Sequence, residues 1–215
     1  MSNADFSVSR TSLILCTSTE ILNHTQMTLI KGNSAELSCL AGLSEVQSRG
    51  VDAGSGELSD PLKLVTTLAR RERCMVLLTG KTDYLTDGRN VIKCDNGHPL
   101  LGKITGSGCA LGVALAAGMA RACAARPGPA QQQAAQQSSA ASSLSQLMVD
   151  VASGADLLSG ALMGLLTITV ASEVAAEAPS TKGPGTLIPA WLDAIAAMDA
   201  ETIAKRAKIS VEVVS

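Results

Sequence analysis

The stretch ITGSGCALG, residues 104–112, sets two glycines around a serine, adds a cysteine, and opens an alanine-rich run. The run predicts a helix that extends to about Ala125, and the first amides of such a helix have no partner within it. The helix dipole adds partial positive charge at the same point. Because Gly106 and Gly108 let a ligand approach the backbone closely, the loop is a candidate anion cradle, most naturally for phosphate.

Cys109 stands in the first turn of this predicted helix. The partial positive charge at the start of a helix favours the thiolate form of a cysteine in the first turn. Cys109 can therefore face both a phosphoryl group and the nucleophile that attacks it. A plainer interpretation is a tight turn that packs the helix on a sheet, since a short Gly-x-Gly is weak evidence. The loop is not a Walker A motif, because no GK[ST] follows, and a full dinucleotide-binding fingerprint is also missing.

Upstream of the loop, helix and strand patterns alternate, which is typical of an α/β layer structure. Asn33 is expected to cap a helix through Leu40, with Glu36 at the third helical position, and Asp60 with Pro61 opens a second helix. The other expected elements are a short helix at 18–25, strands at 27–30 and 74–80, and a hairpin at 82–94 that turns at Asp87-Gly88.

Downstream of the loop, residues 126–146 form a low-complexity stretch that reads as an insertion. A helix is expected from Leu147 to Ala178, with a possible break near Gly154 or Gly160. A final amphipathic helix follows at 187–198.

Composition excludes several classes of protein. With 46% hydrophobic residues, three aromatics and a net charge of -2, the 215-residue chain has neither the basic face nor the stacking platform of a nucleic-acid binder. The six cysteines form no CxxC pair and stand apart from the two histidines, which disfavours a zinc site or a disulfide scaffold. The N-terminus lacks the features of a secretory signal, and the most apolar segment, 157–171, is shorter than the roughly 20 residues of a membrane span. A cytoplasmic protein with no membrane partner is expected.

Four stretches together resemble hydroxyethylthiazole kinase, a ribokinase-like family of the thiamine pathway. They are KGNxxE at 31–36, TGKxDYxTDG at 79–88, NGHPLLGKITGSGC at 96–109 and GPGTLIPAWLDA at 183–194. The resemblance implies a three-layer α/β/α fold over residues 18–197, interrupted by the insertion at 126–146. It also implies Mg²⁺-dependent transfer of the ATP γ-phosphoryl group to the hydroxyl of 4-methyl-5-(2-hydroxyethyl)thiazole.

The resemblance assigns roles to the glycine loop. The amides from Gly106 to Cys109 would form the anion hole, with Gly108 at ATP and Gly106 beside the thiazole. Cys109 would lie next to the substrate hydroxyl, either as a base or as a neutral thiol that only orients this group. Phosphoryl transfer relies chiefly on positioning and charge neutralisation, so both roles stay open.

Four earlier residues match the family's nucleotide site. Asn33 and Glu36 would help to place phosphate and Mg²⁺, although a capping box alone explains the same spacing. Lys31 stands where Arg is usual and would contact ATP phosphates more loosely. Thr79 would bond a phosphate through its hydroxyl. The plainer interpretations are that Lys31 is an ordinary solvated lysine and that Thr79 is a threonine at the end of a strand.

The resemblance fails at both ends of the chain. Residues 1–17 form an atypical segment, 198–215 a C-terminal tail, and the family's N-terminal βα units are expected to be missing. We therefore expect impaired kinase activity, and the family's homotrimer stays open. Two alternatives remain: a non-catalytic nucleotide-binding or assembly subunit, and a ribokinase-like nicotinamide-hydrate dehydratase.

Overall fold

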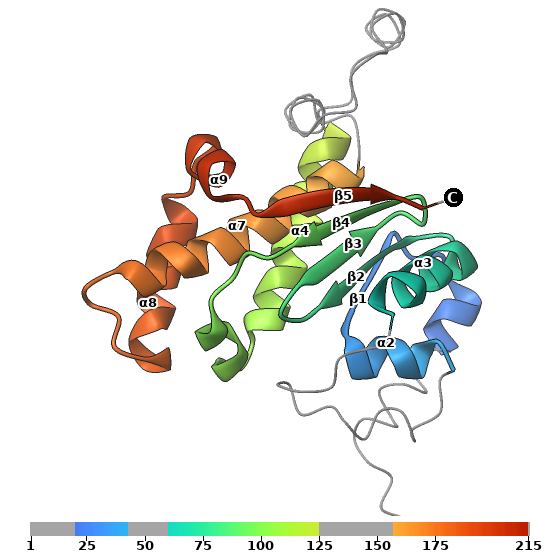
Figure 1. The fold of residues 1–215 in the computed structure, drawn as a ribbon, viewed down its shortest axis with the longest axis horizontal. Coiled ribbons are helices and arrows are strands. Elements are labelled where there is room, and N and C mark those ends of the chain that lie inside the picture. Colours follow the sequence, from blue (N-terminus) through green and yellow to red (C-terminus); the bar gives the residue numbers. More distant parts are fainter. Residues whose placement is uncertain (1–19, 43–59, 125–156, 215) are drawn as a thin grey trace, which may run out of the picture. The chain divides into compact units, whose positions relative to one another are not determined.

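The computed structural model describes residues 20–42, 60–124 and 157–214. The chain divides into two compact units, residues 1–91 with 212–215 and residues 92–211. The described strands form one mixed sheet in the order β1-β2-β3-β4-β5 (Figure 1), and the division between the units runs through β4 and β5. This sheet with its helices confirms the expected α/β class. The expectations for residues 1–17, for the insertion at 126–146 and for a break at Gly154 lie outside the described residues.

In the first unit, local chemistry sets the boundaries of the elements as the sequence predicts. β1 (Leu29–Asn33) ends where Asn33 caps α2 (Ser34–Leu40), and β1 runs parallel to β2 (Met75–Thr79). α3 (Pro61–Glu72) begins with a proline, and the Asp60 carboxylate accepts a hydrogen bond from Lys63 N at 2.9 Å. The capping box, the second cap and both strands are therefore confirmed, although β1 extends beyond the predicted residues 27–30.

The core of the first unit lies between the two helices and the parallel strands. One face of β2 contributes Val76 and Leu78, and α3 packs on it with apolar residues at helical spacing. The buried members of this cluster are Leu37, Leu64, Val65, Leu68, Ala69, Val76 and Leu78. Burial of such side chains stabilises the fold by about 1.5–3 kcal/mol each, which fixes the strand ends that carry candidate site residues.

The predicted hairpin forms from β3 (Asp83–Thr86) and β4 (Asn90–Cys94). Gly88 has φ +91°, and the Asp87 carboxylate accepts hydrogen bonds from Arg89 N at 2.8 Å and Asn90 N at 2.7 Å. Partial burial acts to raise the pKa of Asp87, but these hydrogen bonds outweigh it and lower the pKa. The carboxylate therefore stays ionised and holds the turn at Asp87-Gly88, as the sequence predicts.

The second unit is built around α7 (Leu157–Glu177), against which α4 (Ser107–Ala124), α8 (Pro184–Ala196) and α9 (Ala200–Arg206) pack. α4 and α7 cross at three glycines, where their backbones come into contact. A Cβ at Gly118 would strike the carbonyl oxygen of Gly160, and one at Gly160 would lie 2.6 Å from Gly118 O. Gly164 meets the backbone of Ala114 in the same way. Larger side chains at these positions would force the helices apart.

α7 ends one residue before the predicted Ala178, and the predicted residues 147–156 lie outside the described part of the chain. The helix α7 runs through Gly160 without a break. It has 21 residues and therefore extends beyond the apolar segment at 157–171. By length and composition both α7 and α4 are long enough to cross a membrane, so the argument from shortness is wrong. The most apolar window of α7 is, however, 72% buried inside the structure, which is typical of a core helix.

The stretch that the sequence analysis treats only as a C-terminal tail forms two further elements. Asp199 caps α9 by accepting a hydrogen bond from Thr202 N at 2.7 Å. β5 (Ile209–Val213) follows and completes the sheet order. Within the second unit, Asp95 N donates to Lys208 O at 2.9 Å, which ties the residue after β4 to the residue before β5.

Candidate functional site

The first unit brings candidate residues together at the carboxyl ends of its two parallel strands. Asn33 ends β1, Thr79 ends β2, and the two residues are partners in the strand register. The Thr79 hydroxyl donates to Gly32 O at 3.4 Å, and Lys31 lies two residues before Asn33 on β1. The edge beyond the carboxyl ends of parallel strands is where open α/β sheets bind ligands, so the placement suits a nucleotide site.

The capping box fixes the carboxylate of Glu36 at this edge. Asn33 N donates to Glu36 Oε2 at 2.9 Å, and Glu36 N donates to Asn33 Oδ1 at 2.9 Å. Both side chains are nevertheless exposed. One carboxylate oxygen of Glu36 is therefore held by the backbone, while the group as a whole faces solvent from a defined position. The capping role is established, and it leaves the carboxylate able to reach a hydrated cation.

The glycine loop lies in the second unit and starts α4. Gly106 has φ +92°, a left-handed conformation that glycine adopts without strain. The first helical hydrogen bond runs from Ala110 N to Gly106 O at 3.0 Å, so the amides of Ser107, Gly108 and Cys109 precede it. Gly106, Gly108 and Cys109 are exposed, and a Cβ at Gly106 would meet open space. The loop thus presents helix-start amides to solvent.

Two hydrogen bonds of the Ser107 hydroxyl hold the loop to the chain that precedes it. The single proton of this hydroxyl is shared between Leu101 O at 3.0 Å and Ile104 O at 3.1 Å. Leu101 belongs to the 3₁₀ helix η1 (Pro99–Lys103), which His98 caps through Nδ1. Ser107 was not among the predicted site residues, although a hydroxyl between two glycines at a helix start is well placed to bond the local backbone.

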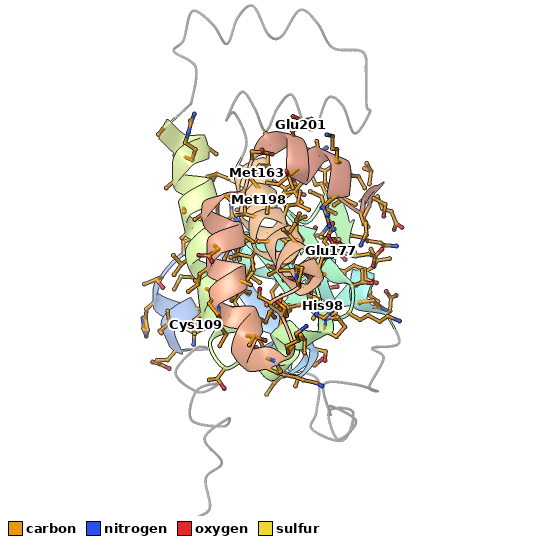
Figure 2. All side chains as sticks on the ribbon, turned by 90° about the vertical axis from the view of Figure 1, so that its left-hand side faces the viewer. His98, Cys109, Met163, Glu177, Met198 and Glu201 are labelled. Carbon is orange, nitrogen blue, oxygen red and sulfur yellow. The ribbon has the colours of Figure 1, made fainter. Side chains whose placement is uncertain are left out.

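A polar cluster anchors the segment before η1 to α7 and to the chain after α9. The Glu173 carboxylate accepts from Gly97 N at 2.9 Å, from Asn96 Nδ2 at 3.2 Å and from Lys208 Nζ at 3.1 Å. His98 N donates to the Ser172 hydroxyl at 3.0 Å. Figure 2 labels His98, which precedes η1, and Cys109, which lies in the first turn of α4. Because these bonds fix the start of η1 and the Ser107 hydroxyl contacts carbonyl groups at its end, the chain that leads into the loop is anchored to α7.

The sequence-predicted residues therefore fall into two groups. Lys31, Asn33, Glu36 and Thr79 share the strand-end edge of the first unit, whereas Gly106, Gly108 and Cys109 share the loop of the second unit. Within the described residues, the structure contains no cluster of three or more His, Cys, Asp or Glu side chains that could hold a metal ion.

Comparison with known proteins gives one consistent result. A model of the "Hydroxyethylthiazole kinase family" matches residues 6–151. A protein of Methanocorpusculum labreanum named hydroxyethylthiazole kinase is 30% identical over 194 residues, which cover 90% of this chain and 60% of the relative. A protein of Histophilus somni with the same name is 30% identical over 192 residues, covering 89% of this chain and 60% of the relative. The chain therefore spans three-fifths of the length of these relatives.

A solved structure shows the same fold. The hydroxyethylthiazole kinase protein from Pyrococcus horikoshii OT3 matches with a TM-score of 0.61 and 24% sequence identity. The match covers 93% of this chain and 60% of the solved one. The elements described above thus follow the architecture of that protein over nearly the whole chain.

Proposed function

Because the chain belongs to the hydroxyethylthiazole kinase family, we propose that it binds ATP and transfers the γ-phosphoryl group to 4-methyl-5-(2-hydroxyethyl)thiazole in the thiamine pathway. The observation that carries the proposal is the loop at the start of α4, with exposed helix-start amides and Gly106 at φ +92°. Such amides, together with the helix dipole, attract phosphate. A kinase needs this arrangement because charge on the moving phosphoryl group must be neutralised.

In the proposed mechanism, the substrate oxygen attacks the γ-phosphorus while the bond to the β–γ bridging oxygen breaks, and ADP leaves. The amides of Gly106, Ser107, Gly108 and Cys109 hold the γ-phosphate oxygens. Cys109 lies beside the substrate hydroxyl and orients it or takes its proton, and Gly106 leaves room for the thiazole ring. The exposure of Cys109 on the loop supports this role.

The strand-end residues of the first unit would also contact nucleotide phosphates. Lys31 places a positive charge near the phosphates, while Asn33 and Thr79 offer an amide and a hydroxyl to them. Mg²⁺ would be bound by the Glu36 carboxylate through water, and when bound it neutralises phosphate charge. The fixed position of Glu36 in the capping box supports this assignment.

The remaining proposals concern the cellular location, the oligomeric state and the partners of the protein. We place it in the cytoplasm as a homotrimer, with ATP and the thiazole alcohol as its partners and neither nucleic acid nor membrane among them. The net charge of -2 supports the exclusion of nucleic acid, and the 72% burial of the apolar window of α7 supports the exclusion of a membrane for that helix, whereas the window of α4 is 17% buried. The matches to proteins named as kinases give no support to the dehydratase alternative.

Calorimetric titration with Mg·ATP and with the thiazole alcohol, followed by an assay for the phosphorylated thiazole, tests the proposed function. We expect both ligands to bind and the phosphorylated product to form, at a rate below that of the longer relatives. Binding of ATP without binding of the thiazole would instead favour a non-catalytic nucleotide-binding subunit. If neither ligand bound, the proposed function would be wrong.

Substitution of Cys109 separates the two roles of this residue. Cys109→Ala should lower turnover roughly 10²-fold, at the low end of what a positioned proton-transfer group contributes. Cys109→Asp should retain or raise turnover, because a carboxylate can take the hydroxyl proton. Single-turnover rates with saturating ATP measure the effect, and unchanged rates in both variants would exclude any proton-transfer role.

Substitutions of Glu36 test its role in the capping box separately from its proposed role in binding Mg²⁺. Glu36→Gln keeps the capping-box hydrogen bond, because glutamine also serves at this position, but it removes the charge. We expect Gln to leave the free energy of unfolding within about 0.5 kcal/mol of the wild type while weakening Mg·ATP binding at least about tenfold. Glu36→Ala should lose both the cap and the binding. Equal ATP affinity in wild type and Gln variant would reduce Glu36 to its capping role.

A further inference from the structure

Glu173 on α7 is an acidic side chain that is largely shielded from solvent. Its side chain is 13% exposed, and three donors converge on one carboxylate oxygen, Oε1. They are Gly97 N at 2.9 Å, Lys208 Nζ at 3.1 Å and Asn96 Nδ2 at 3.2 Å. A carboxylate taken out of water is stable only when donors replace its hydration. Glu173 is therefore held in one place, and its shortest bond is to the backbone of the chain that leads to the glycine loop.

Two successive residues of α7 bond two successive amides of that chain. Glu173 accepts from Gly97 N, and the Ser172 hydroxyl, which is fully buried, accepts from His98 N at 3.0 Å. The next residue, Pro99, has no amide proton to bond. Gly97 has φ +125°, so the backbone takes a conformation that favours glycine at the point where α7 holds it. The entry into η1 is thus specified by α7 and not by a local pattern.

Asn96 joins the same cluster to the chain after α9. Its side chain is buried, with Nδ2 donating to Glu173 Oε1 and also to Arg206 O at 2.8 Å. Its Oδ1 accepts from Lys208 N at 2.7 Å. Because the amide bonds through both of its ends, α7, the end of β4 and the chain between α9 and β5 are tied together at one point.

The 3₁₀ helix η1 connects this cluster to the start of α4. Leu101 N donates to His98 O at 2.9 Å, and Ile104 N donates to Leu101 O at 3.2 Å. The Ser107 hydroxyl then shares its proton between the carbonyl oxygens of Leu101 and Ile104. A path of hydrogen bonds and short stretches of chain therefore joins Glu173 to the first turn of α4.

We propose that Glu173 is a positioning residue for phosphoryl transfer. It contacts neither the nucleotide nor the thiazole; through Gly97 and η1 it sets the direction in which the amides of residues 106–109 point. The inference rests on the proposed function, in which these amides hold the γ-phosphate. Donors stabilise a moving phosphoryl group only when they are aimed at it in advance, and a misplacement of about 1 Å by a distant substitution can cost roughly 10²-fold in rate.

The chain offers a matched control and a reporter of the fold. Glu177 lies four residues later on α7, is 61% exposed, and accepts two 2.8 Å bonds from Arg206 of α9, which lead away from η1. Trp191 is the single tryptophan of the chain; it is buried on α8 and donates from Nε1 to Ile168 O of α7 at 3.0 Å. An unchanged Trp191 emission spectrum shows that α7 and α8 still pack together.

The first measurement uses the ¹⁵N-labelled chain without nucleotide. Glu173→Ala should shift the backbone amide signals of residues 106–109, because Gly97 N loses its acceptor and η1 its anchor. Glu173→Gln should restore most of the wild-type positions, since its side-chain oxygen can still accept from Gly97 N. Glu177→Ala should leave the four signals in place, and Trp191 emission should match the wild type in every variant.

The second measurement is the single-turnover rate of phosphoryl transfer at saturating Mg·ATP. We expect Glu173→Ala to lower it at least about tenfold, Glu173→Gln to recover most of the loss, and Glu177→Ala to stay within about twofold of the wild type. Affinity for Mg·ADP, which has no γ-phosphate, should stay within about twofold in all three variants. A merely structural role would lower the rate and ADP binding together, in proportion to the folded fraction.

A double-mutant cycle with Ser107→Ala tests the path through η1. Ser107→Ala removes the side-chain bond beyond the far end of η1, whereas Glu173→Ala removes the anchor at its start. If both act through η1, the double variant should lose less rate than the product of the two single losses, because one missing anchor already frees the loop.

Three outcomes would overturn the proposal. They are wild-type loop signals in a folded Glu173→Ala chain, equal losses of rate in Glu173→Ala and Glu177→Ala, and losses that multiply fully in the cycle. If Glu173→Ala does not fold, Glu173→Asp takes its place; its carboxylate is one methylene too short to hold Gly97 N, so wild-type loop signals in it would be equally fatal. A wild-type chain that binds no ATP would refute the proposed function instead, and the loop signals without nucleotide would still decide the role of Glu173.

Discussion

Gly106→Val is expected to weaken the binding of Mg·ATP by at least about tenfold and to reduce phosphoryl transfer still further. Gly106 has φ +92°, a conformation that a β-branched residue adopts only as an outlier. A side chain at this position would meet open space, so no neighbouring atom has to move. The loop relieves the strain by changing its own backbone dihedral angles. Relaxation turns the amides of Ser107, Gly108 and Cys109 away from the phosphate, and calorimetry measures the loss.

Gly102 provides the matched control for Gly106. It lies four residues earlier in η1, outside the positive-φ region, and a Cβ there also meets open space. Gly102→Val should therefore keep wild-type affinity for ATP. Strain at Gly106 should cost about 1–3 kcal/mol of stability, so binding is compared where both variants are fully folded. An unchanged dissociation constant for Gly106→Val would show that the loop conformation does not serve the nucleotide.

Gly118→Val is expected to destabilise the second unit by at least about 3 kcal/mol. A Cβ at this position would strike the carbonyl oxygen of Gly160, and the obstacle is backbone that a rotamer change cannot move. The helices α4 and α7 would have to separate along their crossing, which exposes apolar surface around Leu115 and Leu162. Chemical denaturation followed by circular dichroism measures the effect as a lower midpoint.

Ala117→Val separates packing from helix propensity. Ala117 is the neighbouring residue on α4 and is exposed, so a valine there has the propensity cost of a β-branched side chain without touching α7, whereas at Gly118 valine replaces a poorer helix former. That cost should stay within about 0.7 kcal/mol, the range of ordinary helix propensities. Equal destabilisation by the two substitutions would mean that the close crossing at Gly118 is not a determinant of the fold.

Features set by neighbouring residues could be predicted from the sequence. Asn33 with Glu36, Asp60 with Pro61, and Asp87 with Gly88 each satisfy backbone groups within a few residues, and the structure forms all three as expected. The loop at Gly106 belongs to the same class, because its glycines and the helix that follows are adjacent in the chain. Local chemistry thus locates the strand ends and the helix start that carry the candidate residues.

Features that depend on distant contacts were harder to predict. The Gly118 crossing with Gly160 and Gly164 joins segments that are far apart in sequence, and Gly160 was one of two glycines at which a break was predicted. The role of Glu173 is to bond the backbone before η1, which no local pattern indicates. The relation between the strand-end residues and the loop was predicted only through family resemblance, because they lie in different units of the chain.

The C-terminal stretch was missed although local signals were present. Asp199 precedes a short helical pattern and caps it through Thr202 N, which is a standard start signal. ISVEV at 209–213 alternates apolar and polar residues as strands do. α9 is short, so its stability comes less from its own propensity than from tertiary contacts: Ile203 is buried, and Arg206 forms two exposed 2.8 Å bonds with Glu177 of α7.

The central claim is that the amides at the start of α4 hold the γ-phosphate of ATP. Backbone amide NMR of the ¹⁵N-labelled chain tests it directly, by comparing titrations with Mg·ATP and Mg·ADP. We predict that the signals of Gly106, Ser107, Gly108 and Cys109 shift with ATP, shift much less with ADP, and change more than those of Gly102 and Lys103 in both titrations. Saturation with Mg·ATP that leaves these four signals in place would contradict the account.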